Sequence, residues 1–68
     1  MTPLEIRALR IRVGLSQREL GTLAGLAPNS AAIQVNRYEA GTVTPSGPTM
    51  SALELVLAAK VKERERPE

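Results

Sequence analysis

The chain has 68 residues, enough for one small domain, and its apolar residues include no Phe, no Trp and a single aromatic, Tyr38. It contains no Cys and no His, which excludes disulfides, thiolate or imidazole metal sites and His-based triads. We therefore expect no metal, no cofactor and no enzymatic activity. The formal net charge is +2, and a domain this small is commonly stabilised by a partner chain.

The basic residues are concentrated in the first half of the chain. Between Ile6 and Tyr38 there are five Arg residues and one Glu, whereas acids slightly outnumber bases from Glu39 onward. Arg favours bidentate contacts with phosphate or guanine, although a solvated helix face would carry the same charges. The longest apolar run covers only residues 55–59. This is too short for a membrane span, so we expect a cytoplasmic, nucleoid-associated protein without a signal peptide.

Two capping boxes mark the first two predicted helices. The sequence TPLE at 2–5 predicts a helix from Pro3 to about Val13, which Gly14 would end in a left-handed cap. The sequence SQRE at 16–19 predicts a second helix over about 17–24, which Gly25 would end. The expected apolar stripe of this second helix comprises Leu20, Leu23 and Ala24.

Two further helices follow a turn that contains Pro28 and Asn29. Ser30 predicts the N-cap of a helix over about 31–39, whose positions 31, 35 and 38 should face inward. Pro48 predicts the first turn of a helix over about 48–62, with Ser46 or Gly47 near its cap. Its inward face should comprise Met50, Leu53, Leu57 and Val61. Residues 62–68 alternate in charge and include a Pro, which predicts a frayed tail beyond a domain of residues 1–61.

Two short helices joined by a turn, with polar groups on the outer face of the second, indicate a helix-turn-helix. The stretches GLSQREL (14–20), LAGL (23–26) and VNRYEAG (35–41), followed by Pro45, resemble the Cro/repressor (XRE-type) family over about residues 4–58. The resemblance implies an all-α, lambda-repressor-like bundle of four to five helices. The turn at 26–31 is longer than is usual in the family. In this lengthened turn the sequence resembles a subgroup that includes phage, toxin–antitoxin and anti-CRISPR-associated autorepressors. If Pro28 opened the third helix instead, Asn29 would join its DNA-facing side.

The outer face of the third helix carries the expected contacts with DNA bases. Arg pairs with guanine, Asn and Gln pair with adenine, and an aliphatic side chain can meet the thymine methyl group. Each residue also has a plainer explanation as an exposed side chain, a phosphate contact or, for Ile33, packing beneath the turn. The expected base contacts are Ala32, Ile33, Gln34, Asn36 and Arg37. The expected phosphate contacts are Gln17, whose role the resemblance implies, and Arg12, Arg18, Asn29 and Ser30.

The resemblance further implies that Arg10 pairs with Glu39 and ties the first helix to the third. The last helix could complete the core or contact a second copy of the chain, and the interface candidates are Leu55, Val56 and Ala59. A homodimer would present two recognition helices to successive major grooves of a pseudo-palindromic operator.

We therefore expect a sequence-specific regulator that binds double-stranded DNA, and a dimeric repressor of its own operon is the simplest mechanism. The alternative is an antitoxin-type interaction module that neutralises a toxin and regulates its own synthesis. An RNA-binding module fits less well, because single-strand readers usually display stacking aromatics and the only aromatic here should be buried.

Overall fold

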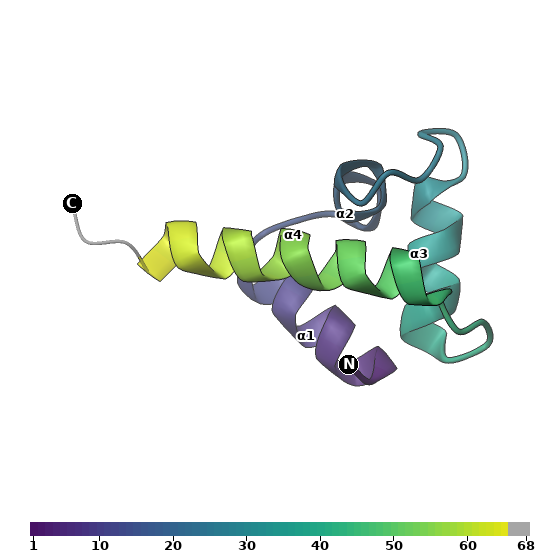
Figure 1. Cartoon of the computed structure of the whole chain (residues 1–68), viewed down its shortest axis with the longest axis horizontal. Helices are drawn as coiled ribbons and strands as arrows, with labels where there is room; N and C mark the ends of the chain where they lie inside the picture. The colour runs from purple at the N-terminus through teal and green to yellow at the C-terminus, as the bar shows by residue number, and fades with distance from the viewer. Residues whose placement is uncertain (66–68) are drawn as a thin grey trace.

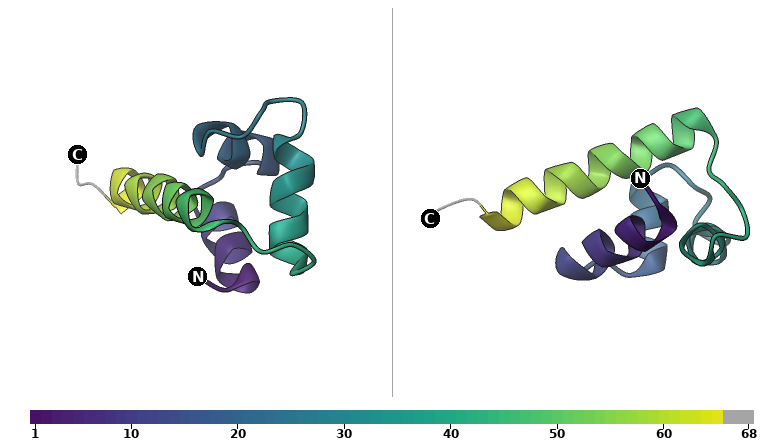
Figure 2. Two further views of the ribbon diagram at one scale, coloured as in Figure 1. Left: turned by 45° about the vertical axis from the view of Figure 1, so that its right-hand side comes forward. Right: turned by 90° about the horizontal axis from the view of Figure 1, so that it is seen from below.

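The computed structural model describes residues 1–65, and this part of the chain forms four helices. Their bounds are α1 Pro3–Arg12, α2 Gln17–Leu23, α3 Ala31–Ala40 and α4 Gly47–Glu65. Figure 1 shows the long α4 crossing the molecule, with α3 at its N-terminal end. The right-hand view of Figure 2 shows that α4 forms one side of the molecule and that the three shorter helices lie beneath it. The all-α bundle predicted from the sequence is confirmed.

Local capping determines where the helices begin. Thr2 and Glu5 form one complete capping box and Ser16 and Glu19 form another, so both predicted boxes are present. Ser46 caps α4, because its hydroxyl oxygen accepts a hydrogen bond from the amide of Thr49 at 3.4 Å. These caps satisfy backbone amides that have no partner inside the helix, and they fix the first residue of α1, α2 and α4.

Seven apolar side chains form the central cluster of the core. The third helix contributes Val35 and Tyr38, and Ala31 from the same face is also buried, as its spacing predicts. All four helices supply at least one member. The other five residues of the cluster are Ile6, Val13, Leu20, Leu53 and Leu57.

Leu23 belongs to the predicted apolar stripe of α2, but it does not pack in the core, because 53% of its surface is exposed. The short α2 contacts the core through Leu20 and packs on α3 through Gly21. Leu23 is turned toward a surface groove that it lines together with Lys60 of α4. Helical spacing alone therefore assigned Leu23 to the wrong surroundings.

Gly21 sets the distance between α2 and α3. A Cβ atom at this position would lie 2.7 Å from the Cβ of Ala31 and 2.9 Å from its carbonyl oxygen. A glycine inside a helix costs about 1 kcal/mol relative to alanine. Here the missing side chain lets the start of α3 pack directly on the backbone of α2.

The fourth helix is longer than predicted, because it continues through Glu65 instead of fraying from residue 62. Lys60 and Glu63 form an ion pair one turn apart, with the nitrogen and oxygen 3.2 Å from each other. Arg12 of α1 pairs with Glu65, which ties the last turn to the rest of the molecule. Of the predicted tail at residues 62–68, residues 66–68 lie outside the described residues. None of the helices described is long and apolar enough to cross a membrane.

Candidate nucleic-acid interface

A hydrogen-bonded turn, rather than an extra helical turn, leads into α3. The amide of Ser30 donates to the carbonyl of Ala27 at 3.0 Å, and residues 28–30 are not helical. The third helix therefore begins at Ala31, and Pro28 does not open it. Ser30 occupies the N-cap position, but its hydroxyl donates to Ala27 instead of capping the helix. Asn29 is exposed within the turn.

The outer face of α3 is exposed and chemically mixed. Asn36 and Arg37 are exposed, and Ile33 beside them has 55% of its surface accessible. Ala32 and Gln34 are half-buried at the edges of this face. Since Ala31, Val35 and Tyr38 turn inward, the five predicted base-contact residues occupy the face and its edges.

A polar recess lies beside this face, where α1, α2 and α3 meet. It is lined by Arg7, Arg10, Gln17, Asn36, Glu39 and Ala40. Glu39 is the only acid among the lining residues and is engaged by its neighbours. Arg10 donates to it through Nε at 2.6 Å and through Nη2 at 3.0 Å, so the pair implied by the resemblance is present.

Two more hydrogen bonds complete the network around Glu39. The Nη1 atom of Arg10 donates to the main-chain carbonyl of Leu15 at 3.0 Å, just before α2 begins. The side-chain amide of Gln17 donates to Glu39 at 3.3 Å. The network therefore orients Gln17 at the start of α2 and links three helices. Nothing in the sequence pattern indicated the contact between Gln17 and Glu39.

Arg7 also lines this recess. Because it stands three residues before Arg10, the two side chains share one face of α1. With Arg10 paired to Glu39, Arg7 supplies the net positive charge of the recess.

Two of the predicted phosphate contacts lie elsewhere. Arg12 pairs with Glu65 and therefore faces the C-terminal end of α4. Arg18 is exposed and borders the groove between α2 and α4. The structure thus brings together Gln17, Asn36 and Arg7, and it leaves Arg12 and Arg18 apart from them.

The capping box of α2 also affects the charge at the start of that helix. Hydrogen bonds from the backbone amide and the hydroxyl of Ser16 hold the pKa of Glu19 below its ordinary value. The same arrangement with Thr2 lowers the pKa of Glu5 at the start of α1. Both carboxylates are therefore committed to caps in their ionised form.

The interface candidates on α4 differ in exposure. Leu55 has 72% of its surface exposed and Ala59 is also exposed. Val56 is partly buried and packs against the core, so it offers less surface to a partner than predicted.

The comparisons with known proteins agree with this arrangement. A family described as helix-turn-helix matches residues 6–63, so the chain belongs to the XRE-type helix-turn-helix family, a class of DNA-binding regulators. A solved structure titled "Crystal structure of transcriptional regulator BswR" aligns with a TM-score of 0.80 and 38% sequence identity. The alignment covers 85% of this chain and 57% of that protein, so the chain spans little more than half of its length. No curated protein matches the chain with a significant score.

Proposed function

We propose that the protein is a sequence-specific transcriptional regulator that binds double-stranded DNA as a dimer and represses its own operon. The observation that carries the proposal is the exposed outer face of α3, with Asn36 and Arg37 beside a recess whose only acid is neutralised. Such a face suits base edges in the major groove, and the recess suits phosphate.

The residues divide into those that select sequence and those that hold the backbone. Arg37 is the leading candidate for guanine, and Asn36 for adenine. Gln17 and Arg7 lie where a phosphate could meet an oriented amide and an Arg side chain near the start of α2. Family membership and the neighbouring regulator support DNA as the ligand.

Repression is the simplest regulatory outcome of such binding. A protein that occupies a promoter blocks RNA polymerase and needs no additional surface for contacting another protein. Two copies are needed because a single recognition helix reads only a few base pairs, and two helices one DNA turn apart read a pseudo-palindrome.

The proposal is tested by selecting bound duplexes from a random pool and measuring affinity for the enriched site. Arg37→Ala should lose about 1–3 kcal/mol and relax preference at one base position. Arg7→Ala should weaken binding to all sequences alike and should reduce the number of ions released on binding by about one. Arg12→Ala on the same helix is the matched control and should leave affinity unchanged, because Arg12 faces Glu65.

A pool without any enriched sequence would contradict specific recognition. Repression is tested with a reporter driven by the upstream region of the protein's own gene. Expression should fall when the protein is supplied and should recover with Arg37→Ala, whereas a rise would contradict repression.

A further inference from the structure

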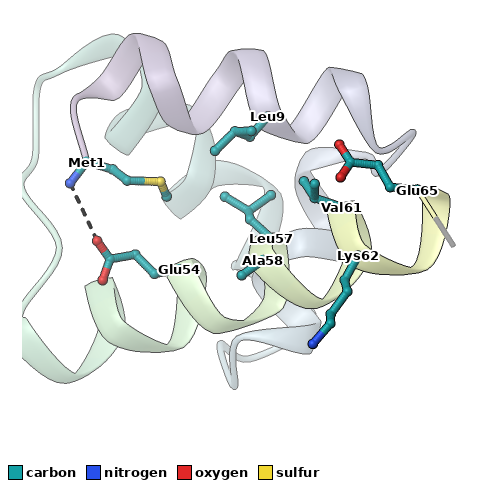
Figure 3. A pocket seen from close by; sticks show the side chains of 8 residues that line it. All are labelled: Met1, Leu9, Glu54, Leu57, Ala58, Val61, Lys62 and Glu65. Atoms are coloured by element: carbon teal, nitrogen blue, oxygen red, sulfur yellow. Dashed lines mark ion pairs between the residues drawn. The ribbon is translucent and has the colours of Figure 1, made fainter.

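An open apolar groove runs between α1 and α4, on a side of the molecule that α3 does not line (Figure 3). Leu57 is buried at its floor, and Leu9 and Val61 are half-buried along its walls. Ala58 is exposed at its edge on α4. The groove therefore presents apolar side chains beside a helix surface that carries a small residue at its centre.

Opposite charges stand on either side of Ala58. Glu54 and Lys62 lie four residues before and after it, so all three occupy neighbouring turns of one helix face. The Oε2 atom of Glu54 forms an ion pair with the N-terminal ammonium nitrogen at 3.6 Å, and 49% of the Glu54 side chain stays exposed. Lys62 points away from α1 in Figure 3 and has no ion-pair partner within residues 1–65.

This pattern is complementary to itself when the helix is reversed. We propose that a second copy of the chain packs its α4 antiparallel against this α4 along the groove, with the twofold axis at Ala58. Glu54 of each copy then faces the partner's Lys62, and the small Ala58 lets the two helices approach closely. The contact is isologous, so a single pair of charges provides two symmetric ion pairs.

The same packing sets the distance between the recognition helices. Ala58 lies eleven positions after Gly47, and at 1.5 Å per residue this places the start of α4 about 16 Å from the axis. The two starts of α4 are then about 33 Å apart, and α3 lies at this end of α4 (Figure 1). One turn of DNA separates half-sites by about 34 Å, which agrees with this distance. The role of this interface in DNA binding rests on the proposed function. Its location rests on the groove and on the charges beside it.

The other side of α4 offers no comparable match. Val56 packs against the core, and Lys60 on that side already pairs with Glu63. In an antiparallel contact with its axis at Ala59, the exposed Leu55 would face the partner's Glu63, so no opposite charges would meet. The charge pattern therefore selects the side of α4 that carries Glu54 and Lys62.

Charge reversal tests the register directly. Glu54→Lys and Lys62→Glu should each raise the dimer dissociation constant about tenfold or more in sedimentation experiments, because like charges then face each other. The double variant Glu54→Lys/Lys62→Glu restores opposite charges and should return close to the wild-type value. Glu63→Lys, a reversal on the same helix outside the groove, is the matched control and should dimerise normally. Circular dichroism checks that every variant keeps its helices.

Single reversals that dimerise like the wild type, or a double variant no better than either single one, would overturn the interface. Disruption by Ala59→Glu with both reversals tolerated would place the contact on the other side of α4 and would overturn it too. A wild type that stays monomeric but still selects a DNA half-site would overturn the interface and the dimer, and would leave sequence-specific DNA binding standing. If the reversals behave as expected but no DNA sequence is enriched, the interface stands and the proposed function fails.

Discussion

Glu39 is the residue at which the three shorter helices meet. Its side chain is 5% exposed, and it accepts hydrogen bonds from Arg10 of α1 and Gln17 of α2. A carboxylate this deeply buried is tolerated because a bidentate guanidinium offsets its charge. The orientation of α3 therefore depends on a polar contact as well as on the core.

Removing the partner of Glu39 should destabilise the fold far more than removing an exposed arginine. Arg10→Ala leaves a buried carboxylate unpaired, and we expect a loss of about 3–5 kcal/mol in the free energy of unfolding. Arg12→Ala removes an exposed pair, with 60% and 59% of the two side chains accessible, and should cost about 0–1 kcal/mol. Urea titration of both variants measures the difference. Equal losses would show that burial of the Glu39 pair is not what stabilises it.

At the scale of the element, the packing of α2 on α3 depends on a residue without a side chain. Gly21 lies against Ala31, and the start of α3 fits only because no Cβ intervenes. The seven residues from 24 to 30 connect the two helices without any helical turn of their own. Contact between α2 and α3, rather than a short turn, thus sets the geometry of this helix-turn-helix.

Gly21→Ala should therefore destabilise the protein although alanine favours helices. Overpacking costs about 1–3 kcal/mol, and the better helix propensity returns at most about 1 kcal/mol. Gly47→Ala is the matched control, because a Cβ there would meet no atom within 4 Å. Thermal unfolding should show a lower melting temperature for the first variant only. A Gly21→Ala variant that is more stable than the wild type would mean that α3 can move away from α2 without a loss of stability.

The capping boxes make the stability of α1 and α2 depend on pH. Because the pKa values of Glu5 and Glu19 are lowered in the fold, their contribution is complete above the ordinary value of 4.5 and is lost as the pH falls through the folded values. The double variant Glu5→Gln/Glu19→Gln should lose less stability than the wild type between about pH 6 and pH 3. Urea midpoints measured across this range test it, with Glu63→Gln as a control outside the caps. A variant as sensitive to acid as the wild type would contradict this role.

Local signals predicted the starts of α1, α2 and α4, because caps and prolines act within one turn of the chain, whereas the predicted Ser30 cap of α3 does not form. The inward face of α3 was also predictable, since Ala31, Val35 and Tyr38 follow helical spacing. The exposure of Leu23 and the extension of α4 to Glu65 were not, because they depend on contacts with other helices. For the same reason the recess was predicted only in part: the Arg10–Glu39 pair came from the resemblance, and the place of Arg7 came from the structure.

At the scale of the whole molecule, one long helix links the end proposed to face DNA to the proposed dimer contact. The start of α4 lies beside α3 (Figure 1). Its last turn is held to α1 by the ion pair between Arg12 and Glu65. In the proposed dimer, the length of α4 up to Ala58 determines how far apart the two recognition helices lie. The spacing of the proposed operator half-sites would therefore be a property of this helix.

This geometry predicts half-sites about 10 base pairs apart from centre to centre. Inserting about half a helical turn of DNA between them should abolish tight binding, because the second recognition helix would face the wrong side of the duplex. Band shifts with a series of spacers measure the effect, and a single half-site is the control. Affinity that is independent of the spacer would contradict a rigid pair of recognition helices.

Tyr38 has a practical consequence that goes beyond packing. It is the only aromatic residue of the chain, and it is 7% exposed in the core on the inner face of α3. Its near-ultraviolet circular dichroism and its fluorescence therefore report on a single, known site. Loss of this signal while the far-ultraviolet helical signal remains would reveal a state whose helices persist but whose core has loosened. The molecule thus carries its own optical probe, placed on the back of the helix proposed to read DNA.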